Sequence, residues 1–500
     1  MSRMLSSEAH TLRLAEDLAA ALRVGDLVAL RGDLGAGKTT LARAILRSLA
    51  GDPHLEVPSP TFTLVQLYET GRLPAAHIDL YRLGDPDEVD ELGIEDMLAR
   101  GIVMVEWPER GALGDPSITV SLREIEGGAR RIATIDALPE AKARIARTLA
   151  ARDFLDRAGH GDAIRRPLNG DASTRGYEAI DSVDGGPTML LMDSPATPDG
   201  PPVRGGLPYS RIAHLAEDVR PFVAIGRALS ERGFHAPAIH AHDLDAGFLL
   251  TEHLGGRSIL GANGRPIAER YLAVAETLAA IHDQAWPTEL PVADGEPLHR
   301  VPPFDRGAMR IEVELTLDWA FPRIVGRAPA DAERNAYLHA WNEVLDGIAG
   351  AEQSLVLRDI QAPNIIWRDG SGHERVGLID FQDALIGPAA YDVASLGQDA
   401  RVTIDSSLEA EIKAAYLGAR VHRDPLFERA YAVMAAERAC KVFGLWVRLD
   451  ERDGKPQYLA NAPRTIAYLE RNLAHPALAP VREWFERHRL LENVPDRVAA

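Results

Sequence analysis

The chain has 500 residues, more than one hydrophobic core usually serves, so we expect two or three domains. Asp and Glu number 74 against 55 Lys and Arg, and the net charge of -19 argues against a broad basic surface that binds nucleic acid strongly and directly. The single cysteine, Cys440, excludes an intramolecular disulfide and a multi-cysteine zinc site. It fits a reducing compartment, and we interpret it as a small, buried apolar residue.

Residues 1–26 mix apolar and charged side chains at helical spacing and lack the unbroken apolar core of a signal peptide. No apolar run approaches the length that spans a bilayer. We therefore expect a cytoplasmic protein that does not associate with a membrane.

Residues 1–147 alternate the patterns of helices and strands, as a layered α/β domain does. An expected helix, "AHTLRLAEDLAAALR", precedes the apolar run "DLVALRG", a glycine loop and a second helix, "KTTLARAILRSLA". The later runs "AAHIDLYRL", "GIVMVEWPE", "SITVSLREI" and "RRIATIDAL" are typical of strands. A charged helical stretch, residues 140–159, joins this region to the next.

The glycine loop "RGDLGAGKTT" fits the phosphate-binding pattern G-x-x-x-x-G-K-[ST], between a strand and a helix. Glycines let successive backbone N–H groups turn toward phosphates, and the helix adds the positive end of its dipole. The lysine adds a point charge, and the first threonine hydroxyl can ligate Mg²⁺. We predict ATP and Mg²⁺ here, held by Gly32, Gly35, Gly37, Lys38, Thr39 and Thr40.

Two carboxylates follow at the ends of apolar strands in the same region. Asp79 comes where a carboxylate can meet the metal, and Glu106 has the same position on another strand and could orient water. Trp107 has two readings, a residue beside the nucleotide and one that packs in the core.

The glycine loop and the runs "VPSPTFTLVQLY", "HIDLYRL" and "VEWPE" together resemble the TsaE family over nearly the whole region. TsaE proteins are the ATPase subunits of the bacterial complex that makes threonylcarbamoyl-adenosine in tRNA (t6A37). The resemblance implies that Asp79 is the Walker-B-type acid near Mg²⁺ and that "SPT", with Thr61, belongs to a nucleotide-sensing loop. It places Glu106 and Trp107 beside the nucleotide. It also implies slow hydrolysis that waits for a partner, and the other subunits of the complex as partners.

A second phosphate-transfer pattern lies in "LVLRDIQAPNIIW", where Asp359 and Asn364 fit the R-D-x-x-x-x-N of a kinase catalytic loop. The Asp must face the incoming hydroxyl, while the Asn turns back to the metal on the nucleotide. The next strand, "RVGLIDFQDA", supplies a further carboxylate, Asp380. The chain is therefore predicted to hold two different ATP sites in two domains.

This pattern resembles the aminoglycoside-phosphotransferase and choline-kinase superfamily. The runs "NGDASTRGY", "LLMDSP", "LLTEHLG" and "VELTLDW" are more narrowly similar to the AmgK group of cell-wall amino-sugar kinases. Those enzymes phosphorylate N-acetylmuramate and N-acetylglucosamine at the anomeric hydroxyl. The resemblance spans most of residues 150–500 and implies Asp359 as base, Asn364 and Asp380 as Mg²⁺ ligands, and Asp392 as structural.

The same resemblance makes "GDASTRG" a phosphate loop, with Ser173, Thr174 and Arg175, and "LLTEHLG" the adenine-holding hinge, with Glu252. Two departures stand out. Leu357 replaces the His of most kinases, and no lysine occurs between residues 142 and 413. Met192 falls near the position of the usual phosphate-binding lysine, and Arg175 is a candidate substitute.

Two further features have structural interpretations. "RIEVELTLDWAF" is expected to be an amphipathic helix with Glu312, Glu314 and Asp318 partly solvated, and lining of the sugar pocket is the alternative. His282, at a helix end, is expected to be structural rather than catalytic.

We predict an α/β P-loop NTPase domain over residues 1–147, followed by an α+β bilobal, kinase-like (aminoglycoside phosphotransferase) domain over residues 148–500. Its small lobe covers about residues 148–255 and its large lobe about 256–500. Three hypotheses stay open for the second domain: an amino-sugar kinase, a nucleotide-binding regulator without transferase activity, and an aminoglycoside- or choline-type kinase. The absent lysine favours the regulator, and the set of Asp359, Asn364 and Asp380 opposes it.

Overall fold

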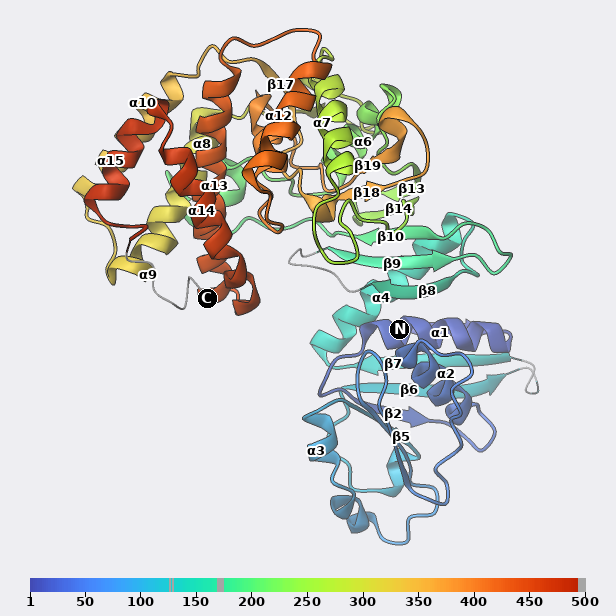
Figure 1. Cartoon of the computed structure of the whole chain (residues 1–500). Helices are drawn as coiled ribbons and strands as arrows, with labels where there is room; N and C mark the ends of the chain where they lie inside the picture. Colours follow the sequence, from blue (N-terminus) through green and yellow to red (C-terminus); the bar gives the residue numbers. More distant parts are fainter. Residues whose placement is uncertain (126, 128–129, 169–174, 493–500) are drawn as a thin grey trace. The chain divides into compact units, whose positions relative to one another are not determined.

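The computed structural model describes residues 1–125, 127, 130–168 and 175–492 (Figure 1). The chain divides into two compact units, the first made of residues 1–193, 241–243 and 248–250, the second of the remainder. The first unit thus extends past residue 147, where the sequence predicted the domain boundary. That boundary stays a prediction.

A seven-stranded mixed sheet organises the start of the first unit, in the order β1-β7-β6-β2-β5-β4-β3. Strands β6, β2, β5 and β4 run parallel to their neighbours in the middle, and the outer pairings are antiparallel. The strands are β1 (Ser2–Leu5), β2 (Leu27–Arg31), β3 (Val65–Tyr68), β4 (Ala75–Asp79), β5 (Ile102–Glu106), β6 (Ile118–Ile125) and β7 (Arg130–Ala137). The four strand runs predicted after the glycine loop are confirmed; β1 and β3 were not predicted.

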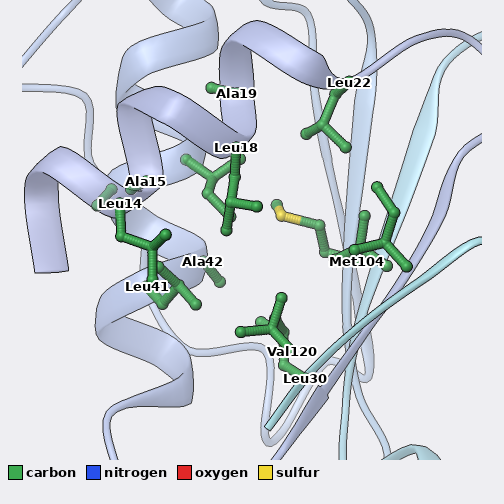
Figure 2. Close-up of a cluster of buried hydrophobic side chains, with 14 of the residues drawn as sticks. Leu14, Ala15, Leu18, Ala19, Leu22, Leu30, Leu41, Ala42, Met104 and Val120 are labelled. Carbon is green, nitrogen blue, oxygen red and sulfur yellow. The ribbon is translucent and has the colours of Figure 1, made fainter. Parts of the chain in front are cut away.

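Helices α1 (Glu8–Ala21), α2 (Lys38–Ala50) and α4 (Pro139–Arg157) contribute to one hydrophobic core of this sheet, while α3 (Ile94–Leu98) packs with the other. Figure 2 shows Leu18 and Leu41 directed at Met104 and Val120 of the sheet. Each fully buried side chain of this size contributes about 1.5–3 kcal/mol. This packing fixes the start of α2, and therefore the glycine loop, against the ends of β2 and β5.

Buried charges join α1 and α4 to the next strands of the same unit. Asp17 accepts from Arg152 at 3.1 Å and from Arg165 at 2.6 Å, and Arg165 also donates to Glu178 at 2.6 Å. The side chains of Asp17 and Arg165 are 3% and 2% exposed, so neither charge could stay there without the other.

Glu178 and Arg165 belong to a five-stranded sheet of order β13-β14-β10-β9-β8. Its strands are β8 (Ile164–Leu168), β9 (Gly176–Asp181), β10 (Met189–Asp193), β13 (Ile239–Asp243) and β14 (Phe248–Glu252). Met192 lies buried in β10, so the strand that carries the phosphate-binding lysine in most kinases has no cation at that position.

The second unit is mainly helical, and α13 (Phe427–Glu451) is its longest buried helix. Gly444 permits its close packing, because a Cβ there would lie 2.2 Å from the backbone of Leu315. The other helices are α5 (Tyr209–Ile212), α6 (Arg220–Glu231), α7 (Ala268–His282), α8 (Arg306–Leu315), α9 (Phe321–Val325), α10 (Asp331–Asp346), α11 (Ala390–Gly397), α12 (Ser406–Ala419), α14 (Ala462–Leu473) and α15 (Ala479–Arg487).

Short strand pairs complete the second unit, and two of them frame the predicted catalytic loop. The strands are β11 (Pro202–Arg204), β12 (Leu207–Pro208), β15 (Glu289–Leu290), β16 (His299–Arg300), β17 (Gln353–Val356), β18 (Ile365–Trp367), β19 (Val376–Leu378) and β20 (Leu385–Pro388). β17 pairs with β20 and β18 with β19, both antiparallel.

One expectation about α8 is wrong. Glu312 and Glu314 are 0% and 4% exposed rather than partly solvated. Glu312 pairs with Arg358 and Lys441, and Glu314 pairs with Arg204, so distant cations make this burial possible.

Cys440 and His282 fit their structural interpretations. Cys440 is a buried free thiol, and His282 is buried with its Nδ1 atom 2.9 Å from the Tyr416 hydroxyl. Among the residues that the structure describes, every helix is too short or too polar to cross a membrane.

Candidate functional site

The glycine loop turns between β2 and α2 through three left-handed glycines. Gly32, Gly35 and Gly37 have φ angles of 140°, 85° and 102°, which residues with a Cβ rarely adopt. At Gly32 a Cβ would also lie 2.4 Å from the carbonyl oxygen of Leu122. Gly37 is the N-cap of α2, so the loop leads directly into the helix start, where backbone N–H groups can face an anion.

Lys38 lies inside its own loop. Its Nζ atom donates to the carbonyl oxygens of Gly32 at 2.7 Å and Asp33 at 3.0 Å, and it lies 3.6 Å from the centroid of the Trp107 ring. Burial lowers the pKa of Lys38. The lysine thus donates two hydrogen bonds to the backbone of the loop in which phosphates are expected to bind.

The two predicted carboxylates come together because β4 and β5 are parallel neighbours, with Asp79 directly opposite Glu106. The Thr39 hydroxyl donates to Glu106 Oε2 at 2.8 Å, and His77 Nε2 lies 2.9 Å from Glu106 Oε1. The other carboxylate, on Asp79, accepts from Thr61 Oγ1 at 2.6 Å. The predicted residues of this region therefore form two hydrogen-bonded groups on neighbouring strands, one around Glu106 and one around Asp79.

These oxygen donors fit Mg²⁺, which proteins usually hold through one or two carboxylates together with nucleotide phosphates. Among the described residues, no three His, Cys, Asp or Glu side chains gather to hold a metal by themselves. Thr39 and Asp79 would hold the ion with the phosphates. Trp107 follows β5 with a φ of 57°, unusual for a large side chain, and this backbone places its ring over Lys38.

The predicted catalytic loop of the second unit connects β17 to β18 and is fixed from behind. Asp392 accepts the backbone N–H groups of Leu357 at 2.6 Å and Arg358 at 2.8 Å. Arg358, with a φ of 74°, sends its guanidinium inward to Glu312 and to the carbonyl oxygen of Ala213. The structural role that the resemblance implied for Asp392 agrees with these contacts.

Asp359, Asn364 and Asp380 come together at the mouth of this loop. Asn364 Nδ2 donates to the carbonyl oxygen of Asp359 at 2.9 Å and to Asp380 Oδ2 at 3.3 Å. The Asp359 side chain is 34% exposed, and its Oδ1 accepts from Arg438 at 3.3 Å. Gln382 Nε2 donates to Asp380 Oδ1 at 2.9 Å. The carboxylate and amide oxygens fit Mg²⁺, and Asp359 remains open to a substrate hydroxyl.

Sequence reasoning missed Arg438 and Gln382, and it misjudged Glu312. Gln382 had a signal, since it is two residues after Asp380, whereas Arg438 is 79 residues from Asp359 and had none. Burial opposes ionisation of Glu312, but the charges of Arg358 and Lys441 prevail and lower its pKa to about 2. Burial raises the pKa of the neighbouring Glu437 well above its ordinary value.

The remaining predicted residues lie elsewhere or outside the description. Glu252 ends β14, with its carboxylate 3.1 Å from Arg368 and 3.4 Å from His235. Arg175 directly precedes β9 in the first unit. Ser173 and Thr174 lie outside the described residues.

The fold and the two sites define a protein that joins a P-loop nucleotide-binding domain to a kinase-like phosphotransferase domain. Residues 5–132 match the family described as threonylcarbamoyl adenosine biosynthesis protein TsaE, and residues 164–435 match the phosphotransferase enzyme family. The chain belongs to both families, as a fusion of the two. The two resemblances found in the sequence are thereby confirmed.

Curated relatives divide in the same way. An N-acetylmuramate/N-acetylglucosamine kinase of Caulobacter vibrioides is 34% identical over 69% of this chain and 98% of its own length. A kinase with the same name from Pseudomonas aeruginosa is 32% identical over 67% of this chain and 89% of its own. The tRNA threonylcarbamoyladenosine biosynthesis protein TsaE of Rickettsia felis is 40% identical over 25% of this chain and 75% of its own.

Proposed function

We propose that this protein is bifunctional. Its P-loop domain is an ATPase that supports threonylcarbamoyl-adenosine formation in tRNA, together with other subunits of that modification complex. Its second domain is an ATP- and Mg²⁺-dependent kinase that phosphorylates N-acetylmuramate and N-acetylglucosamine at the anomeric hydroxyl in cell-wall recycling. Both activities belong to the cytoplasm, where ATP and tRNA are available.

The observation that supports the kinase is the convergence of Asp359, Asn364 and Asp380 on one loop mouth. Mg²⁺, when bound, neutralises charge on the nucleotide phosphates. Asn364 and Asp380 would hold the ion, and Asp359 orients the sugar hydroxyl and takes its proton. A bond forms between the sugar oxygen and the γ-phosphorus as the bond from that phosphorus to the β–γ bridging oxygen breaks, which leaves ADP.

The phosphate contacts of the kinase differ from those of most kinases, because Met192 occupies the position of the usual lysine. Arg175 is the proposed substitute. A regulator without transferase activity is the second candidate function. Only the absent lysine favours the regulator. A regulator would not need an exposed Asp359 beside two metal ligands, so the arrangement of the loop favours the kinase.

The P-loop site supports a switch with slow basal hydrolysis. Lys38, Thr39 and Asp79 are each hydrogen-bonded within the protein, so a bound nucleotide must first displace those contacts. Glu106 is the residue proposed to orient the attacking water, and in this structure it is engaged by Thr39 and His77. A partner subunit that releases Glu106 would start hydrolysis.

The test is a phosphate-transfer screen of the purified chain against N-acetylmuramate, N-acetylglucosamine, choline and an aminoglycoside. The proposal expects the two amino sugars to be substrates and their product to carry an acid-labile anomeric phosphate. Phosphorylation of choline or the aminoglycoside alone would replace the proposed acceptor, and transfer to none of them would favour the regulator. Wild-type and Lys38→Ala chains, assayed in parallel with the other complex subunits, test the ATPase role.

A further inference from the structure

A cavity of about 440 Å³ lies in the second unit, beside the proposed kinase centre. Its walls come from residues 210–221, from the segment 292–302 that precedes α8, and from Gln382 and Ala384. The volume is within the roughly 300–1,000 Å³ of small-ligand sites.

Two walls of the cavity are tied to the catalytic loop and the metal ligands. Gln382 donates to Asp380, and its own Oε1 atom is buried without a hydrogen-bond partner among the described residues. On another wall, His214 directly follows Ala213, whose carbonyl oxygen accepts from Arg358 at 2.9 Å. The Gln382 side chain therefore links a molecule in the cavity to Asp380.

Two acidic side chains of the cavity form ion pairs with two of its arginines. Glu217 pairs with Arg211 at 3.4 Å, and Asp218 pairs with Arg220 at 3.0 Å. Both arginines also bind acids outside the cavity lining. Asp199, Asp245 and Glu296 share these two arginines with Glu217 and Asp218, so carboxylates outnumber guanidinium groups in both clusters, and an anion in the cavity would bind away from them.

Arg300 is different, because it is exposed on the cavity and forms no ion pair or side-chain hydrogen bond within the described part of the chain. Burial lowers the pKa of the adjacent His299, which disfavours the charged form of its imidazole. A guanidinium binds a carboxylate through two parallel N–H donors, which gives both energy and orientation. Among the described residues, Arg300 is thus an arginine of the cavity lining whose charge no carboxylate pairs.

We infer that this cavity receives the acceptor sugar and that Arg300 binds the carboxylate of N-acetylmuramate. The inference rests on the proposed kinase function. N-acetylmuramate differs from N-acetylglucosamine by a lactyl ether, and the carboxylate of that ether is the only charge on either sugar. Arg300 is therefore a specificity-determining residue that distinguishes the two acceptors, while Asp359 acts on the hydroxyl that both share.

The experiment measures kcat/KM for both sugars, and KM for ATP, in the wild-type chain and in Arg300→Gln and Arg300→Lys. For Arg300→Gln we expect the ratio of kcat/KM for N-acetylmuramate to that for N-acetylglucosamine to fall about 10- to 100-fold, the range of a lost charged hydrogen bond. The fall should come through KM for N-acetylmuramate. Arg300→Lys should recover part of the ratio, because it keeps the charge and loses the paired geometry.

Arg265→Gln is the matched control, since Arg265 is also exposed and without an ion pair in the described chain but lies outside the cavity. It should leave the ratio unchanged. An equal fall for both sugars in Arg300→Gln would overturn the inference and leave the proposed kinase standing. A raised KM for ATP with both sugars would instead assign Arg300 to the nucleotide phosphates and also overturn it. A wild-type chain that phosphorylates neither sugar would refute the proposed function, and this inference with it.

Discussion

The two proposed phosphate sites of this chain differ in how far their functional side chains are already hydrogen-bonded to other protein groups. In the P-loop site the functional side chains are already engaged by other protein groups: Lys38 donates to backbone carbonyl oxygens of its own loop, and Thr39 donates to Glu106. In the kinase site the supporting groups are buried, but Asp359 is left 34% exposed at the surface of its loop. A nucleotide at the P-loop site must therefore displace existing hydrogen bonds, whereas Asp359 of the kinase site is already accessible to a substrate.

The difference follows from where each site obtains its rigidity. The P-loop residues are fixed by contacts among the functional groups themselves, so binding must exchange those hydrogen bonds for new ones, each with a net worth of about 0.5–1.5 kcal/mol. The kinase loop is fixed from behind by Asp392 and by the buried pair of Arg358 and Glu312. Its position therefore does not depend only on contacts among Asp359, Asn364 and Asp380, and the Asp359 side chain stays 34% exposed.

The largest expected effect is on stability and concerns the buried ion pair of Glu312 and Arg358 behind the catalytic loop. Glu312→Gln should lower the free energy of unfolding of the second unit by about 3–5 kcal/mol at pH 7, because it leaves Arg358 buried without its partner. The folded pKa of Glu312, about 2, is below the ordinary 4.5, so this stabilisation is present above pH 4.5 and is lost as pH falls toward 2. Denaturant melts of both proteins at several pH values measure the difference.

Glu428→Gln, which breaks an exposed pair with Lys413, is the control for this loss of stability and should cost about 0–1 kcal/mol. A Glu312→Gln protein as stable as the control variant would show that the loop does not depend on its buried ion pair. The buried ion pair could then not explain why the kinase loop is held in place while Asp359 stays exposed.

The second prediction tests whether the open site is catalytic. Asp359→Asn should lower kcat for the amino sugars roughly 10²-fold or more, the contribution of a positioned acid–base group. ATP affinity should change little, because Asn364 and Asp380 still hold the metal. Asp380→Asn should instead weaken Mg·ATP binding as well as turnover. Steady-state kinetics and nucleotide titration separate the two variants, and a near wild-type kcat in Asp359→Asn would remove Asp359 from the role of base.

The third prediction tests whether the sites are independent. Lys38→Ala should weaken ATP binding at the P-loop about 10- to 100-fold, since it removes a charged donor to the phosphates. Sugar phosphorylation should persist, because the variant leaves the kinase motifs untouched. Calorimetric ATP titration and the kinase assay measure the two. Parallel loss of both activities in a folded Lys38→Ala protein would contradict the two-site interpretation.

A smaller effect tests whether the P-loop site is restrained by its own contacts. Thr61→Val removes the donor that lies 2.6 Å from Asp79 and keeps the side-chain shape. Asp79 then becomes more available to the metal, and we expect about three- to tenfold tighter Mg²⁺-dependent nucleotide binding, the scale of one modest hydrogen bond. Titration of ATP at varied Mg²⁺ measures it. Weaker binding would mean that Thr61 contacts the nucleotide directly and that the restraint lies elsewhere.

The smallest change is expected at Cys440, which lies in the core behind the kinase site. Burial raises the pKa of its thiol to about 12, so very little thiolate exists at pH 8. Iodoacetamide should leave the native protein unmodified by mass spectrometry and alkylate it fully once denatured. Rapid labelling of the native chain would show that the core of the second unit opens, which would contradict the burial of Cys440 in this structure.

The sequence by itself determined both phosphate motifs, and the reason is local. A phosphate cradle is made by consecutive backbone N–H groups, so a strand, glycines, Lys38 and a helix in the right order suffice to predict it. The catalytic loop is equally compact, since Asp359 and Asn364 are separated by a single turn. The central parallel strands β2, β4 and β5 followed from their apolar runs, because such a strand is buried on both faces.

Tertiary structure alone decided which distant groups meet. Arg438 reaches Asp359, and Arg165 reaches Asp17 across 148 residues of chain. Glu312 was expected to be solvated because a helix pattern cannot show that Arg358 and Lys441 will arrive beside it. A charge can be buried only where an opposite charge is packed against it, and packing depends on the path of the whole chain rather than on the spacing within one element.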